Sequence, residues 1–158
     1  MAQGSLWQLG VGAIGSENST TEIHLTEIAS MVIRVVQLGS DRNPSEGKRI
    51  GTVRRPPRGV PKSEFSTRNW YDVWLPNLAP SVETMTLGRA ATTSAEWEKF
   101  LKKFQQEMAA PDASHVLDLL TALSHSSDFS VGCYCEDEAR CHRSVLRALL
   151  TERGAEVA

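Results

Sequence analysis

The chain has 158 residues, of which 41% are hydrophobic and 23% charged, and its formal net charge is −2. This length suits one domain with a hydrophobic core, and the composition is ordinary for a globular protein. The slight negative charge argues against a globally basic nucleic-acid binder, although it permits a local basic patch.

The cysteine count and the N-terminal sequence indicate the cellular compartment. Three cysteines form an odd set without a disulfide framework, which fits a reducing compartment. The apolar stretch LWQLGVGAIG is short and broken by glycines, so we expect neither a signal peptide nor a membrane helix. We therefore predict a cytoplasmic protein, with residues 1–30 as a poorly defined extension and 31–158 as one domain.

Two strands are expected early in this domain. Residues 31–38 (MVIRVVQL) are β-branched and continuous, which is typical of a strand buried on both faces. Residues 39–47 consist of turn-forming types, and residues 49–54 (RIGTVR) predict a second, weaker strand.

A basic segment follows the second strand. Between Lys48 and Lys62 lie six basic residues and no acidic residue. Three prolines stiffen the segment, and the planar guanidinium group suits phosphate and carboxylate. We expect Arg54, Arg55 and Arg58 to bind an anion; the alternative is a solvated basic loop. The anion would be a phosphorylated small molecule, a nucleic-acid backbone or the acidic residues 136–138 of the chain itself.

Helices are expected in the middle of the chain. The aromatic residues of 69–74 (NWYDVW) have helical spacing, residues 86–93 are expected to form a loop, and residues 94–108 give the clearest helix, with Ser94 as its cap. Its apolar stripe predicts a core-facing surface. A second helix is expected around residues 116–123.

The most informative stretch is 129–150. Residues 129–135 alternate with a period of two, which predicts a strand; residues 136–138 (EDE) form an acidic turn, and a helix follows that ends at Gly154. Ligands of open α/β sheets sit at the carboxyl end of such a strand. A helix start also favours an anion or a thiolate.

Three interpretations compete for Cys133, Cys135, Cys141 and His142. The first is apolar packing, and the second is a metal site. The spacing fits metal poorly, because Cys133 and Cys135 would stand roughly 6.6 Å apart along a strand, so we assign no metal ligands; for the same reason a disulfide between them is disfavoured. The third is a reactive thiol activated by His142 or Arg143.

Together these elements predict the α/β class. A helix on each side of the strand at 129–135 implies parallel, right-handed connections. We expect a small, mostly parallel sheet with helices packed on both faces.

The order of five motifs resembles the domain-of-unknown-function 488 (DUF488) family. They are GKRI at 47–50, RxPPRGV at 54–60, WLPNLAPS at 74–81, WxxFxxxFxxEM at 97–108 and CxCE…RCHRSxL at 133–146. The resemblance covers about residues 31–158. It implies a single α/β domain, names no reaction, and carries over Arg54, Arg55, Arg58, Cys135, Glu136, Cys141, His142 and Arg143 as site residues.

Three functions follow from these residues. The first is an enzyme for an anionic substrate, bound by Arg54, Arg55, Arg58 and Arg143, with Cys135 or Cys141 as nucleophile, His142 as acid or base and Glu136 as a second carboxyl. The second is a non-catalytic nucleotide or nucleic-acid binding module. The third is a small metal-binding or redox-sensing protein. The sequence names no cofactor and says nothing firm about oligomers.

Overall fold

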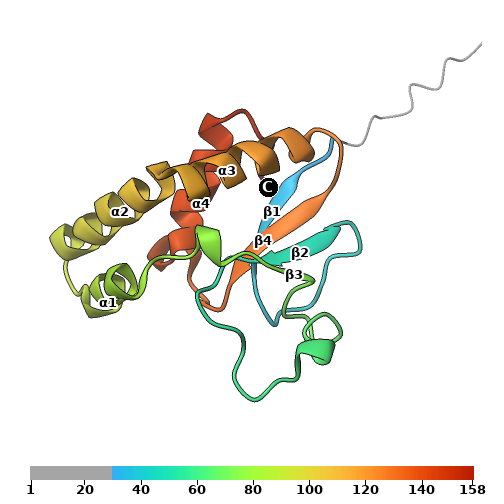
Figure 1. The fold of residues 1–158 in the computed structure, drawn as a ribbon, viewed down its shortest axis with the longest axis horizontal. Coiled ribbons are helices and arrows are strands. Elements are labelled where there is room, and N and C mark those ends of the chain that lie inside the picture. Colours follow the sequence, from blue (N-terminus) through green and yellow to red (C-terminus); the bar gives the residue numbers. More distant parts are fainter. Residues whose placement is uncertain (1–29) are drawn as a thin grey trace, which may run out of the picture.

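The computed structural model describes residues 30–158, which fold around a four-stranded, all-parallel sheet (Figure 1). The strands are β1 (Ile33–Gln37), β2 (Lys48–Gly51), β3 (Val73–Trp74) and β4 (Phe129–Cys133), in the spatial order β1-β4-β2-β3. The helices are α1 (Val82–Ala90), α2 (Ser94–Ala109), α3 (Pro111–Ser124) and α4 (His142–Glu152). Three short 3-10 helices, η1 (Lys62–Glu64), η2 (Pro76–Leu78) and η3 (Glu138–Arg140), lie in the connections.

Strand β4 is the centre of the sheet. It pairs in parallel with β1 on one side and with β2 on the other, and all five of its residues are buried. Gly132 is favoured there, because a Cβ at this position would lie 2.6 Å from the Leu38 side chain and 3.0 Å from the carbonyl oxygen of Val36. The absence of a side chain makes room for the side chain of Leu38, the residue that follows β1.

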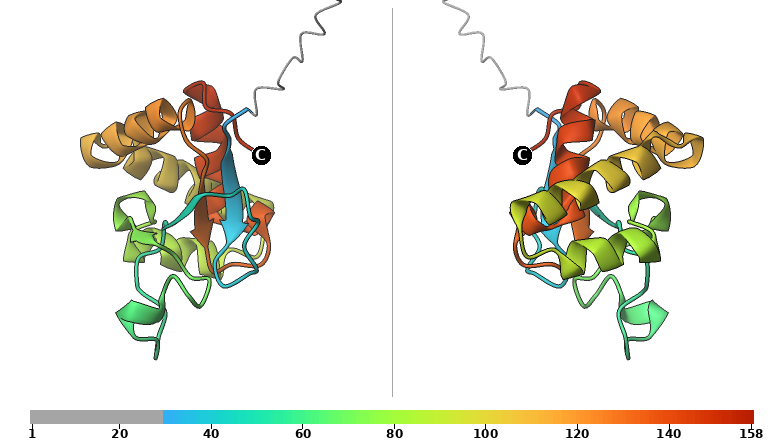
Figure 2. Two further views of the ribbon diagram at one scale, coloured as in Figure 1. Left: turned by 90° about the vertical axis from the view of Figure 1, so that its right-hand side faces the viewer. Right: turned by 90° about the vertical axis from the view of Figure 1, so that its left-hand side faces the viewer.

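The helices cover one face of the sheet (Figure 2). Phe129 and Val131 of β4 pack in one hydrophobic core with Phe104 of α2, Leu117 of α3 and Leu146 of α4. Helix α2 begins with a capping box, in which Thr93 and Glu96 satisfy each other's backbone N–H groups. Its apolar stripe then faces the sheet.

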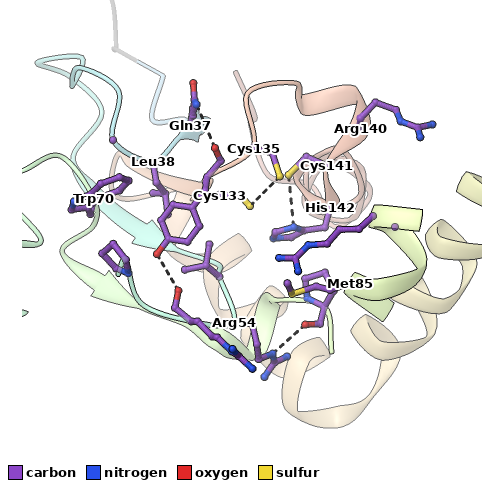
Figure 3. Close-up of a pocket in the computed structure, with 18 of the residues that line it drawn as sticks. Gln37, Leu38, Arg54, Trp70, Met85, Cys133, Cys135, Arg140, Cys141 and His142 are labelled. Carbon is purple, nitrogen blue, oxygen red and sulfur yellow. Dashed lines mark hydrogen bonds between the residues drawn. The ribbon is translucent and has the colours of Figure 1, made fainter. Parts of the chain in front are cut away.

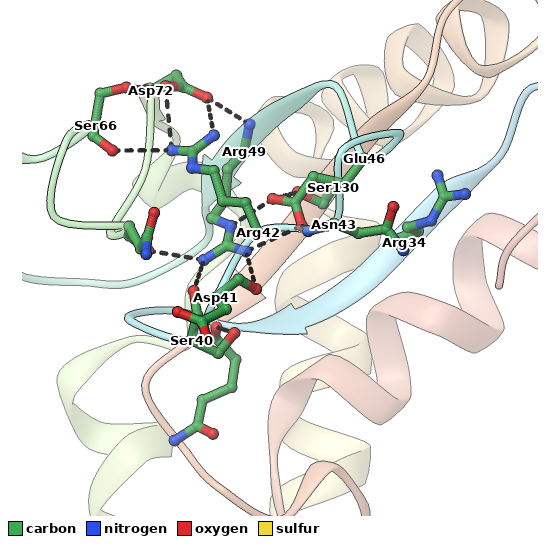
Figure 4. Close-up of polar contacts among 12 residues, drawn as sticks. Arg34, Ser40, Asp41, Arg42, Asn43, Glu46, Arg49, Ser66, Asp72 and Ser130 are labelled. Carbon is green, nitrogen blue, oxygen red and sulfur yellow. Dashed lines mark hydrogen bonds and ion pairs between the residues drawn. The ribbon is translucent and has the colours of Figure 1, made fainter.

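Loops cover the opposite face, around an ion pair between Glu46 and Arg49 (Figure 4). Arg49 is fully buried and its Nε donates to Glu46 at 2.7 Å, while its Nη1 donates to the carbonyl oxygens of Ser40 and Asn69. A buried guanidinium group needs such partners, because an unpaired charge is costly away from water. One side chain thereby joins β2 to both covering loops.

The α/β class, the parallel sheet and the single domain are confirmed. The covering of the second face differs from the predicted one, because loops around Arg49 take the place that we assigned to helices. Strand β1 also differs, since it is an edge strand with four half-buried residues and not one buried on both faces. The expected extension, residues 1–30, lies outside the described residues except for Ser30.

Two local predictions are wrong. Residues 69–74 form turns and the short strand β3, not a helix, and Asn69 adopts a left-handed backbone with φ of 61°. Residues 86–90 belong to α1, not to a loop. This helix has a weak apolar face and is held by tertiary bonds, in which Ser81 and Thr84 donate to Glu107 of α2.

The cap of α2 was placed one residue too late, since Thr93 and not Ser94 precedes the helix. The helices at 94–109, 111–124 and 142–152 are confirmed, and the strand expected at 129–135 is present but ends at Cys133. Among residues 30–158, no helix has both the length and the apolar character needed to cross a membrane.

Candidate functional site

A cavity of about 990 Å³ lies beyond the carboxyl ends of β1, β2 and β4 (Figure 3). Its walls come from five parts of the chain that are far apart in sequence: residues 37–40, 53–58, 85 with 88–89, 133–135 and 140–142, together with Trp70, Pro80, Trp97 and Phe100. This is the position at which open parallel sheets bind ligands. We call it the arginine cavity.

Five arginines line this cavity, and no carboxylate is among the described residues that line it. They are Arg54, Arg55, Arg58, Arg89 and Arg140. Within residues 30–158, none of the ion pairs includes any of these five arginines, so their guanidinium groups have no carboxylate partner there. A cluster of like charges without counter-charges gives a positive potential that attracts an anion.

Two of the arginines are held in place by uncharged groups. Arg54 donates to the carbonyl oxygens of Ala79 and Pro80, at 2.7 and 3.1 Å. Arg140 donates to Ala91 and lies over the ring of Trp97, at 4.3 Å from its centroid. These contacts fix each side chain without neutralising its charge, which leaves the charge for a ligand.

The three cysteines meet at one corner of the cavity. Their sulfur atoms all lie within 4.8 Å of one another, and the Sγ atoms of Cys133 and Cys135 are 3.8 Å apart. Cys133 and Cys141 are buried, whereas Cys135 is exposed, and all three are free thiols. Strand β4 ends at Cys133, so the extended spacing of roughly 6.6 Å expected between the two residues no longer applies at Cys135.

The thiols polarise one another. Hydrogen bonds from Cys133 and Cys141 lower the pKa of Cys135 to about 3; burial opposes this and the charge of Arg143 reinforces it. Hydrogen bonds with Cys135 and Cys141, together with burial, raise the pKa of Cys133 far above its usual value. A hydrogen bond from Cys133 also lowers the pKa of Cys141, as does the contact with His142. Cys133 therefore keeps its proton, and Cys135 is the accessible thiolate.

His142 is buried at the start of α4, and its ring lies beside the sulfur of Cys141. Its Nε2 lies 2.8 Å from the carbonyl oxygen of Thr52, and its Nδ1 lies 3.7 Å from the sulfur of Cys141. Because a carbonyl oxygen only accepts hydrogen bonds, Nε2 must carry a proton. Nδ1 is then the nitrogen that can exchange a proton, and its neighbour is Cys141.

Arg143 and Glu136 lie behind the thiol corner. Arg143 is buried and donates to the carbonyl oxygen of Cys135 at 2.6 Å and to that of Glu136 at 3.4 Å. Neither residue is among those that line the arginine cavity, and Glu136 is exposed. In this geometry Arg143 holds the backbone that carries Cys135.

A family model described as the active DUF488-N3 subclade (DUF488-N3a) matches residues 33–154, which include the whole sheet and all the cavity residues. The chain belongs to the DUF488 family. No curated protein and no solved structure gives a significant match.

The structure brings together most of the predicted site of this DUF488 chain. Arg54, Arg55 and Arg58 share one cavity with Cys135, Cys141 and His142, although some 80 residues separate the two groups in sequence. Sequence reasoning missed Arg89 and Arg140, because only tertiary contacts bring α1 and η3, which carry them, to the cavity. Arg140 had one available signal, since it directly precedes the Cys-His-Arg segment.

Proposed function

We propose that this protein is an enzyme that acts on an anionic, phosphate-bearing substrate, with the cavity arginines as the anion site and Cys135 as the nucleophile. The observation that carries the proposal is the shared cavity, which is lined both by five arginines without carboxylate partners and by the residue with an accessible sulfur. The word "active" in the description of the matching subclade agrees with a catalytic role. Free thiols also suit the reducing, cytoplasmic setting that we expect for the protein.

The chemistry assigns one task to each group. The Cys135 sulfur forms a bond to the electrophilic atom of the substrate while the bond from that atom to the leaving group breaks. The leaving group keeps the bonding electron pair and takes a proton from the Cys141–His142 pair. Water then attacks the intermediate, releases the sulfur as thiolate and returns a proton to the same pair. Arg143 positions Cys135 through its carbonyl oxygen.

A second candidate is a non-catalytic nucleotide or nucleic-acid binding module. It is favoured by Trp70 and Tyr134, aromatic residues that line the same cavity as the arginines and are of the kind that stack on bases. Binding by this module would weaken steeply with salt and would not need Cys135. Salt-dependent affinity for an oligonucleotide, retained in the Cys135→Ala variant and without turnover of any substrate, would favour this candidate.

The enzyme proposal is tested by alkylation of Cys135 with iodoacetamide, followed by mass spectrometry of the peptide, with and without inorganic phosphate or pyrophosphate. We expect rapid labelling that the anions slow by at least about tenfold when the site is saturated. The double variant Arg55→Gln/Arg58→Gln should lose this protection. Lys62→Gln is the matched control, because Lys62 belongs to the same basic segment but does not line the cavity.

Turnover is tested on a panel of nucleotides, sugar phosphates and phosphate monoesters. Activity that disappears in Cys135→Ala but persists in Lys62→Gln supports the mechanism. Activity that is unchanged in all three single cysteine→Ala variants would remove the thiols from the chemistry. Equal alkylation rates with and without every anion would remove the arginine cavity as the anion site.

A further inference from the structure

We infer that Cys133, Cys135 and Cys141 form a binding site for a thiophilic divalent cation such as Zn²⁺, and that the bound cation switches off the thiol chemistry of the arginine cavity. Binding of the cation stands on the geometry alone. Its effect on turnover rests on the proposed function.

The sulfur positions fit one tetrahedral ion. With metal–sulfur bonds of about 2.3 Å, two sulfur ligands of a tetrahedral zinc site stand roughly 3.8 Å apart. Cys133 and Cys135 already have their sulfurs 3.8 Å apart, and all three sulfurs lie within 4.8 Å of one another. Small side-chain rotations are therefore enough to bring the third sulfur to a coordination distance.

The backbone places these sulfurs before any ion binds. Cys133 is the last residue of β4, and Cys141 directly precedes α4, where its N–H donates to the carbonyl oxygen of Glu138. The hydrogen bond from Arg143 to the carbonyl oxygen of Cys135 holds the segment between them. A site whose ligands are already positioned loses little conformational entropy when the metal binds.

The surroundings suit a centre with net negative charge. Binding of the cation releases the Cys133 proton to solvent, so three thiolates and one divalent cation carry a charge of −1, and the corner is flanked by the start of α4 and by the cavity arginines. Leu38, Val53 and Tyr71 pack against Cys133 and Cys141, which gives the buried side of the site an apolar wall. Such a wall limits water access and strengthens metal–ligand interactions.

The fourth coordination position faces the cavity. Among residues 30–158, this is the only group of three or more metal-ligating atoms so close together, and His142 is not part of it. All three cysteines line the arginine cavity, so a water molecule or a ligand anion would complete the coordination. Three protein ligands with one open position distinguish this arrangement from a closed structural zinc site.

Metal binding and nucleophilic attack compete for the same electron pairs. A thiolate acts either as a nucleophile or as a metal ligand, and Cys135 is needed for both roles. The bound cation would therefore block alkylation of Cys135 and stop turnover, and a chelator would restore both. The cavity would then be active only when the thiophilic metal is scarce.

The experiment titrates the whole chain, reduced and stripped of metal, with Co²⁺ as a spectroscopic substitute for Zn²⁺. We expect thiolate-to-cobalt charge-transfer absorption that saturates at one ion per chain and is abolished by Zn²⁺. Loss of an outer hydrogen-bonding partner lowers metal affinity by roughly tenfold. Loss of a ligand should lower the affinity for cobalt by more than that. Cys135→Ser is the main variant, because Cys135 is exposed and its replacement leaves the core intact.

The control is Glu136→Gln, which removes the neighbouring exposed carboxylate and should leave cobalt binding unchanged. Blocking the exposed Cys135 thiol of the unmodified chain with a methanethiosulfonate removes this ligand without a substitution that could impair folding. No charge-transfer absorption, or the same absorption after this thiol is blocked, would overturn the metal site.

The consequence for the cavity is read separately. Zn²⁺ at one equivalent should saturate the site and slow alkylation of Cys135 by at least about tenfold. A chelator should restore the original rate. Metal binding that leaves both alkylation and turnover unchanged would overturn the switch. Metal binding in a chain whose Cys135 is not protected by phosphate would leave the metal site standing and refute the proposed function alone.

Discussion

Asp72 shows how much one side chain contributes to the arrangement of the loops. Its carboxylate accepts two hydrogen bonds from Arg42, at 2.8 and 3.2 Å, one from the backbone N–H of Arg49 and one from Ser66 (Figure 4). Burial alone would raise the pKa of Asp72, but these bonds outweigh it and hold the pKa at about 2, below the ordinary 3.8. The carboxylate thereby ties the loop before β3 to β2.

The pH dependence of stability follows from this shift. Because the pKa is lower in the folded state, the contribution is fully present above pH 3.8 and is lost as the pH falls through about 2. We expect Asp72→Asn to cost about 2 kcal/mol of unfolding free energy at neutral pH. Urea unfolding at a series of pH values checks this, and a difference from the unmodified chain that does not shrink between pH 4 and pH 2 would contradict it.

At the scale of elements, the packing of β4 depends both on the apolar side chains that it buries and on a glycine that has no side chain. Gly132 is the register partner of Val36 in β1, and a Cβ there would meet Val36 and the side chain of Leu38. The close approach also places Cys133 at the end of β4 beside Leu38, whose N–H donates to the Cys133 carbonyl oxygen. Packing at this glycine therefore positions one wall of the arginine cavity.

Replacing Gly132 with alanine should destabilise the fold by about 1–3 kcal/mol, the usual cost of overpacking a rigid site. Chemical denaturation of Gly132→Ala, Leu38→Ala and the double variant would measure the cost. Since Leu38 supplies the nearest atom, at 2.6 Å, the double variant should be less destabilised than the sum of the two by more than about 0.5 kcal/mol. Strict additivity would show that the strain lies elsewhere.

At the scale of the whole molecule, five separate segments converge to make a positive cavity in a chain whose net charge is −2. The ion pairs of the described residues lie outside it, so the folded state holds five arginines against their mutual repulsion. An anion that binds there relieves this repulsion and stabilises the folded state.

Pyrophosphate should therefore raise the melting temperature, and the unfolding free energy should increase by about 2.7 kcal/mol at one hundred times the dissociation constant. Differential scanning calorimetry at constant ionic strength measures this effect. Arg55→Gln/Arg58→Gln should reduce the gain, and Lys62→Gln should not. An equal gain in both variants would indicate a general salt effect.

The amino-acid sequence by itself determined the elements with strong periodicity and the residue types of the candidate site. The apolar stripe at 97–108, the alternation at 129–133 and the Cys-His-Arg segment depend on neighbours within a few residues, so local pattern reveals them. The charge of the basic segment is equally local. The residues 69–74 and α1 were misassigned because tertiary contacts decide their conformation, as Asp72 and Glu107 show.

Only the tertiary structure decided how these pieces meet. Sequence spacing predicted that Cys133 and Cys135 would stand apart, but the strand ends between them and their sulfurs converge with that of Cys141. The approach of the basic segment to the thiols, and the contribution of Arg89 and Arg140, depend on the order in which parallel strands pair. That order is set by burial of both faces of β4, which is a property of the packed sheet and not of any one segment.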